Sequence, residues 1–125
     1  MSISQTCLFI GGIANCFLAL QCLRAIPTLL NPSVSLPNVS VNANRRSLAL
    51  TSLRTTFLHA FFGAITFAFP QELLTPTFGA VIGGGIAVYL AFTALEQFRL
   101  PEYTGTGWPI ACTVGAIAYL LAYIF

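Results

Sequence analysis

Two ionisable side chains, Arg54 and His59, lie five residues apart within a long apolar stretch. In a helix with 100° per residue, both would share a face about 140° wide with a set of hydroxyl side chains. That set comprises Ser47, Thr51, Thr55 and Thr66. An ionisable group inside a membrane is costly unless it is paired or hydrated, so each is a candidate functional residue. A histidine at this depth would suit quinone or haem binding or a proton relay.

Both side chains also have a structural interpretation. Arg54 can extend its charged end to the headgroups, or pair with Glu96 near the end of a following apolar stretch. His59 can stay neutral and form a hydrogen bond with Asn15, a threonine or a backbone carbonyl. The candidate catalytic or ligand-binding set is therefore Arg54, His59 and Glu96, and the sequence leaves both interpretations open.

Few other reactive groups accompany them. The chain has one histidine, three glutamates and no aspartate, which does not supply a hydrolytic triad or a metal-ligand set. The four cysteines show no C-x-x-C spacing, so we expect them to fill small spaces in the core. We therefore predict no metal and no cofactor of the chain's own, although a bound lipid or quinone is compatible with its residues. A non-catalytic protein is favoured over an enzyme.

The composition explains why the charges are so few. Of 125 residues, 57% are hydrophobic and only 6% are charged, whereas a soluble domain has about 25% charged residues. The net charge is only +2, and the positive residues are too scattered to bind the phosphate backbone of a nucleic acid. Nucleic-acid binding is therefore not expected. The partners that this composition favours are membrane lipids and other integral membrane subunits.

One membrane crossing needs about 20 apolar residues, and the chain has four such stretches, at about 3–23, 47–69, 73–98 and 108–125. Prolines mark their ends. We expect Pro27 to lie beyond the first helix, Pro70 to close the second, Pro76 to lie in the first turn of the third and Pro109 to open the fourth. The prediction is an all-α integral membrane bundle of four transmembrane helices, with residues 1–125 forming a single domain.

The arginines predict an orientation. Arg24, Arg45 and Arg46 flank the first connection and Arg99 the third, while both termini and the connection after Pro70 carry none. The positive-inside rule then places both termini on the non-cytoplasmic or non-matrix side. The membrane would be an organelle inner membrane or the endoplasmic reticulum. Arg24, Arg45 and Arg46 are the candidate contacts to anionic lipid headgroups or to an acidic partner.

Two further expectations depend on this orientation. Tyr103 and Trp108 would lie at the inner membrane interface, and Tyr119 and Tyr123 would lie toward the outer one. Asn38 begins an Asn-Val-Ser glycosylation acceptor. On the inner side it would stay unmodified.

Small residues are the expected contacts between the helices, because lipid is as apolar as leucine and only close packing and hydrogen bonds drive association. The candidate packing positions are Gly11, Gly12, Gly79, Gly83 and Gly115. The run Gly83–Gly84–Gly85 costs helix propensity, and close backbone contact is the expected compensation.

These observations favour a non-catalytic accessory subunit or scaffold of a larger membrane complex of the respiratory, ATP-synthase or photosynthetic type. The alternative is a small membrane enzyme or carrier for a lipophilic substrate, such as a quinone, sterol or isoprenoid, using Arg54 and His59. A homo-oligomeric channel is a weaker option, because no repeated ring of charge is evident.

Overall fold

The structure is a computed structural model that describes residues 1–31, 42–99 and 107–125, without the side chains of 42–44 and 96–99. Every regular element in these ranges is a helix. Four of them are long and apolar enough to cross a membrane. The elements are α1 (Ile3–Leu30), α2 (Asn42–Ala68), the short α3 (Pro70–Leu73), α4 (Phe78–Arg99) and α5 (Gly107–Ile124). The expected all-α bundle of four long helices is confirmed.

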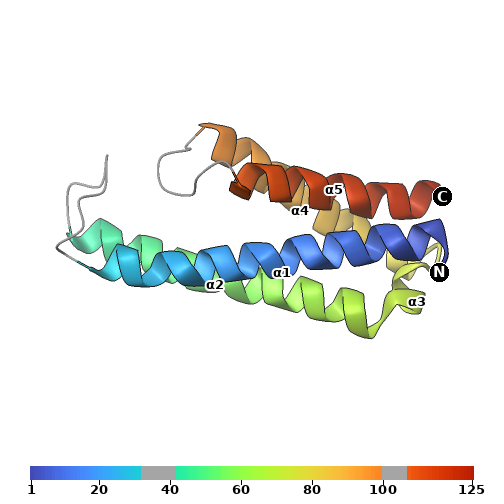
Figure 1. Cartoon of the computed structure of the whole chain (residues 1–125), viewed down its shortest axis with the longest axis horizontal. Helices are drawn as coiled ribbons and strands as arrows, with labels where there is room; N and C mark the ends of the chain where they lie inside the picture. The colour runs from blue at the N-terminus through green and yellow to red at the C-terminus, as the bar shows by residue number, and fades with distance from the viewer. Residues whose placement is uncertain (32–41, 100–106) are drawn as a thin grey trace.

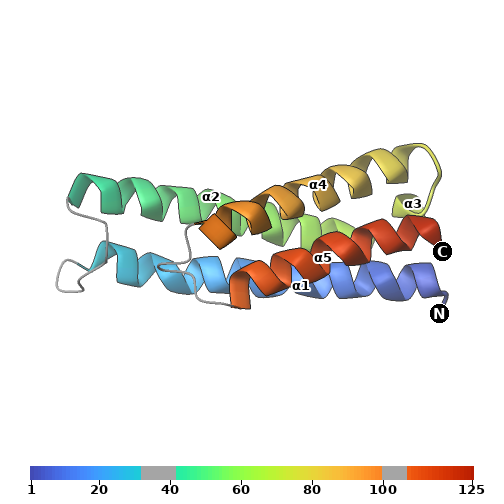
Figure 2. The same ribbon diagram turned by 90° about the horizontal axis from the view of Figure 1, so that it is seen from above.

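The four long helices run side by side along the long axis of the molecule, with both termini and α3 at one end (Figure 1). The view from above places α1 and α5 on one side of the bundle and α2 and α4 on the other (Figure 2). The most extensive contacts join α1 to α2, α1 to α5 and α5 to α4. Within the described residues, α2 and α4 do not share a comparable backbone contact. The bundle is therefore least tightly closed along its α2–α4 side.

Helix α1 begins with a capping box, in which Ser2 and Gln5 each bond to the other's backbone N–H. It then continues through Pro27 to Leu30, so the expectation that Pro27 lies beyond the helix is wrong. The proline has no N–H to donate to the Leu23 carbonyl one turn earlier, and one more helical turn follows it. That turn is held by the buried Leu29 side chain and by the Asn31 N–H, which donates to the Pro27 carbonyl.

In the connection between α2 and α4, Pro70 lies where it was expected and Pro76 does not. Pro70 follows α2 and opens α3 at a position where a missing N–H costs nothing. Pro76, however, lies in the turn before α4 and not in the helix's first turn, because α4 begins only at Phe78. Thr75 organises this start: its hydroxyl donates to the Glu72 carbonyl and accepts from the Gly79 N–H.

The distribution of side chains is that of a membrane protein. Many of the large apolar side chains point outward, and Phe57, for example, is 68% exposed. Buried polar side chains lie inside the bundle, among them Asn15, His59 and Thr66. Threonine hydroxyls on α2 donate to carbonyls one turn earlier in the same helix, at Ser47, Thr51, Ser52 and Phe62. The arrangement fits a multi-pass membrane protein.

Candidate functional site

His59 lies at the centre of the bundle and is 0% exposed. Its Nδ1 atom is 2.8 Å from the Asn15 Oδ1 atom on α1. The Asn15 amide nitrogen donates to the Gly11 carbonyl at 3.3 Å and to the Tyr119 hydroxyl at 3.1 Å. Because a backbone carbonyl can only accept, this contact orients the amide and leaves Oδ1 facing His59. His59 therefore donates from Nδ1, and in the neutral ring Nε2 carries a bare lone pair.

The hydrogen bonds continue beyond Asn15 in one direction. The Tyr119 hydroxyl on α5 is 2.5 Å from the Thr66 Oγ1 atom on α2, and Thr66 donates its own proton to the Phe62 carbonyl at 2.8 Å. Tyr119 must then donate to Thr66 and accept from Asn15. The resulting donor chain, defined here as His59, Asn15, Tyr119 and Thr66, ends at a backbone carbonyl. It ties α1, α2 and α5 together.

Two polar atoms at this centre have no hydrogen-bond partner among the described residues, the Nε2 atom of His59 and the Nε1 atom of Trp108. The imidazole meets the indole edge-on, with ring centres 6.0 Å apart and an interplanar angle of 83°. The Tyr89 ring from α4 also lies near the imidazole, with ring centres 5.7 Å apart. His59 is thus set among aromatic rings, with its free lone pair inside the bundle.

The structure places two of the three sequence-based candidates, Arg54 and His59, in different environments. Arg54 is exposed on the outside of α2, whereas His59 is buried. No described residue bonds or pairs with Arg54. The Glu96 backbone belongs to α4, but its side chain lies outside the described residues. Among the described residues, the polar chemistry of the interior therefore falls to His59 and its neighbours, with Arg54 on the outer surface of α2.

Three other arginines mark the end of the bundle opposite the termini. Arg24 and Arg46 are exposed. Arg45 is half-buried, and its Nη1 atom donates to the Asn31 carbonyl at 2.5 Å. Arg45 therefore links the start of α2 to the end of α1, while the other two guanidinium groups face outward at the same end.

The glycines on α1 and α5 lie where another helix approaches. A Cβ atom on Gly11 would come within 2.7 Å of the Tyr119 ring. On Gly12 it would meet the Phe67 ring, and on Gly115 it would meet Leu90 and Ala14. These three positions allow α1, α2, α4 and α5 to pack at close range.

The glycines of α4 differ among themselves. Gly79 lies against the Leu73 backbone and Gly83 against the Tyr123 ring. The Tyr123 hydroxyl bonds to the carbonyls of Leu73 and Gly79, at 2.7 and 2.6 Å. Gly84 and Gly85, in contrast, have no described atom within 4 Å of an added Cβ. The close contact expected for the whole run holds only for Gly83.

Two aromatic residues of α5 that the sequence predicts at the membrane interfaces are buried within the bundle. Tyr119 is 0% exposed and Trp108 6% exposed, so both rings pack against other helices and do not face the surroundings of the bundle. Tyr103 lies outside the described residues. The signal that places Tyr119 inside is its spacing: it follows Gly115 by four residues, on the small-residue face of α5.

The cysteines are free thiols and differ in burial. Cys22 and Cys112 are buried and Cys7 is half-buried, but Cys16 is exposed. Filling of the core is therefore not the role of Cys16. In the part of the chain that the structure covers, no three His, Cys, Asp or Glu side chains gather into a metal-binding group.

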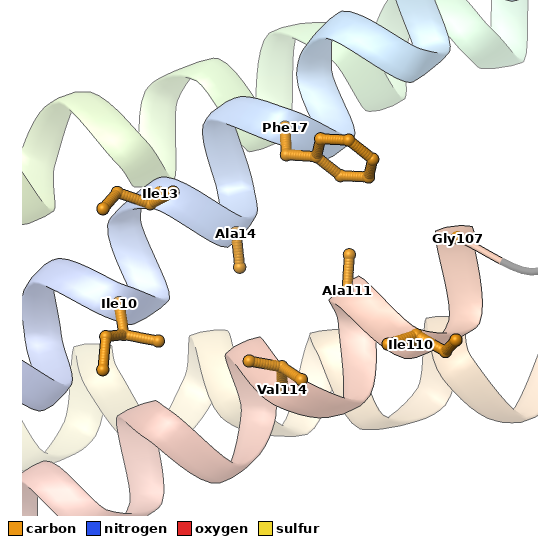
Figure 3. Close-up of a pocket in the computed structure, with 8 residues that line it drawn as sticks. All are labelled: Ile10, Ile13, Ala14, Phe17, Gly107, Ile110, Ala111 and Val114. Atoms are coloured by element: carbon orange, nitrogen blue, oxygen red, sulfur yellow. The ribbon is translucent and has the colours of Figure 1, made fainter.

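An apolar groove of about 490 Å³ lies between α1 and α5. Side chains from the two helices face each other across it (Figure 3). Its lining is Ile10, Ile13, Ala14, Phe17, Gly107, Ile110, Ala111 and Val114. With no polar side chain in this set, the groove is suited to hydrocarbon and offers nothing that would orient a polar group.

No family model, curated protein or solved structure matches the chain.

Proposed function

We propose that the protein is a non-catalytic accessory subunit or scaffold of a larger membrane complex, of the respiratory, ATP-synthase or photosynthetic type. The observation that carries this proposal is Arg54, an exposed guanidinium on a membrane-spanning helix with no partner among the described residues. It lies nine residues beyond Arg45, which is about 13 Å along α2. A charge at that depth in lipid is costly, and a carboxylate or carbonyl of an adjoining subunit would offset the cost.

The rest of α2 supports a partner on the same helix. In the apolar 18-residue part of α2, only 17% of the residues are buried within the bundle. The corresponding share is 39–44% in the other three long helices. Bulky side chains cover its outer surface, and Leu53, Phe57 and Phe61 are each at least half exposed. Because packing drives helix association in membranes, a helix with so little burial in its own bundle is the best surface for a second protein.

The interior supports a structural role as well. The Nδ1 atom of His59 and the polar atoms of Asn15 and Tyr119 serve to bond helices to one another. No serine, threonine or cysteine is bonded to His59 among the described residues, so the histidine has no nucleophile to activate. The polar groups of the core therefore hold the bundle together, and the outside of α2 is left for assembly.

Extraction from the native membrane in mild detergent, followed by native mass spectrometry, tests this proposal. We expect a stoichiometric complex that Arg54→Ala weakens by about tenfold and Arg54→Lys weakens less, since the charge remains. Arg24→Ala is the matched control, because it removes an exposed arginine from a different helix. A monomeric wild-type chain, or equal effects of the two alanine variants, would contradict the proposal.

A second candidate function is supported by a different observation. The bare Nε2 lone pair of His59 favours a small membrane enzyme or carrier for a lipophilic molecule, such as a quinone, sterol or isoprenoid. Loss of an activity in His59→Ala, with assembly intact, would favour this candidate over the accessory subunit.

A further inference from the structure

The unpaired atoms of His59 and Trp108 require opposite partners. His59 donates from Nδ1 to Asn15, so its Nε2 can only accept a hydrogen bond. The indole Nε1–H of Trp108 can only donate. Both side chains are more than nine-tenths buried, and buried polar groups are almost always hydrogen-bonded. One acceptor and one donor thus lie unsatisfied together in the middle of the bundle.

We propose that His59 and Trp108 form a binding position for a neutral hydroxyl group. A hydroxyl can donate its proton to His59 Nε2 while its oxygen accepts from Trp108 Nε1–H. The two rings are neighbours, with ring centres 6.0 Å apart, and the proposal places one hydroxyl oxygen within hydrogen-bond reach, about 2.9 Å, of each nitrogen. The hydroxyl belongs either to a water molecule or to a membrane-soluble alcohol.

Other polar groups fit this pair less well. A carbonyl accepts from Trp108 but leaves Nε2 unsatisfied, and an ammonium group does the reverse. A metal ion on Nε2 would face the indole N–H, which has no lone pair to offer. Only a group that both donates and accepts satisfies the two atoms, and the hydroxyl is the simplest neutral one.

The donor chain fixes the position from the other side. Asn15 holds the imidazole through Nδ1, and Asn15 is itself held by Tyr119 and the Gly11 carbonyl. Rotation of the ring to place Nδ1 near Trp108 would break the bond to Asn15. The histidine is therefore set in one tautomer and one orientation before any ligand arrives, which lowers the entropic cost of binding.

In this proposal, a ligand would enter from the lipid on the α2–α4 side of the bundle. These helices lack the extensive contact of the other neighbours, and Tyr89 fills the space between them. Its ring packs at 5.7 Å from His59 and 5.6 Å from Phe62, yet the residue is only half-buried. An alcohol with an apolar chain would place its hydroxyl at His59 and extend the chain past Tyr89 toward the lipid.

The chain contains one histidine and one tryptophan, so nuclear magnetic resonance can observe both atoms without ambiguity. The experiment uses the full-length protein in lipid nanodiscs, labelled with ¹⁵N at histidine and tryptophan. It is titrated with 1-dodecanol, and with n-dodecane as the control that lacks the hydroxyl. If an alcohol occupies the position, dodecanol but not dodecane shifts the His59 Nε2 and Trp108 Nε1 resonances saturably.

If water occupies the position, the Trp108 Hε1 resonance shows a cross-peak to a bound water before any alcohol is added. Trp108→Phe removes the donor and is expected to weaken dodecanol binding about tenfold, the factor that one hydrogen bond can supply. Thr113→Val is the matched control on the same helix, because the Thr113 hydroxyl bonds only to the Pro109 carbonyl, and it should leave dodecanol binding unchanged.

The wild-type titration decides the question even if a variant does not fold. The proposal is overturned if neither a bound water nor a dodecanol-dependent shift is seen. It is also overturned by a scalar coupling between the two nitrogens, which would show that Trp108 donates directly to His59. These outcomes do not depend on a partner at α2, so the proposed accessory function is tested separately.

Discussion

Tyr119 is the residue on which the polar interior depends most. Its hydroxyl accepts from Asn15 on one helix and donates to Thr66 on another, while its ring packs on Gly11. Without that oxygen, the Asn15 amide nitrogen would lose its interhelical acceptor and donate only to the Gly11 carbonyl. The His59 ring would then be held by an amide that is itself less firmly held.

Tyr119→Phe should therefore lower the free energy of unfolding by about 1–2 kcal/mol, the range for one hydrogen bond between membrane helices and its unsatisfied partner. The measurement is the unfolding midpoint in mixed micelles of mild detergent and dodecyl sulfate. Thr113→Val is a control, because the Thr113 hydroxyl bonds only to the Pro109 carbonyl of its own helix. A Tyr119→Phe effect no larger than that of the control would contradict the donor chain.

The sequence allowed part of this centre to be recognised. Asn15 and His59 stand out because polar side chains in apolar helices must find partners. Tyr119 and Trp108 do not stand out, because amphipathic rings near helix ends suit a membrane interface equally well. Which of the two environments they occupy depends on the rotation of α5 against its neighbours, and hydropathy alone does not determine that rotation.

At the scale of the helices, two glycines differ in how closely a neighbouring helix approaches them. At Gly11 an added methyl would be pressed against the Tyr119 ring, which is buried and bonded and so has little freedom to move. At Gly84 the same methyl would meet open space. The two substitutions change the helix propensity in the same way, so they isolate the effect of packing between helices.

Gly11→Ala is expected to destabilise the bundle by about 1–3 kcal/mol through overpacking. Gly84→Ala is expected to stabilise α4 by up to about 1 kcal/mol, the difference in helix propensity between the two residues. Thermal unfolding followed by circular dichroism in one detergent measures both. Equal shifts for the two variants would show that Gly11 is not at a close helix contact.

The number of long helices was predictable because each requires a sustained apolar stretch. Their ends were less so, because single hydrogen bonds and buried side chains determine them. Proline usually ends a helix, but α1 continues past Pro27. Its last turn is held by the buried Leu29 side chain and by the Asn31 N–H, which donates to the Pro27 carbonyl. The third long helix was expected to begin at about residue 73 but begins at Phe78, and the Thr75 hydroxyl before it accepts from the Gly79 N–H.

At the scale of the whole molecule, the two ends of the bundle differ in charge. Both termini and α3 lie at one end (Figure 1), and Arg24, Arg45 and Arg46 belong to the helix ends at the other. The positive-inside rule predicts that the arginine end faces the cytoplasm or matrix. In sealed vesicles with that face outward, epitope tags on both termini should resist added protease until detergent opens the membrane.

Digestion of either tag in intact vesicles would contradict this orientation, and so would a glycan on Asn38. Removal of positive charge provides a further check. Replacing Arg45 and Arg46 together by glutamine should make the orientation mixed, because these residues supply two of the cationic groups beside the first connection.

The threonines of α2 have a consequence for how the chain enters a bilayer. By residue type this helix is the least apolar of the four. Yet the hydroxyls of Thr51, Thr55 and Thr56 are already bonded to carbonyls of their own helix. A hydroxyl with a partner costs much less to transfer out of water than a free one. During synthesis, α2 should therefore partition into lipid more readily than its amino-acid composition indicates.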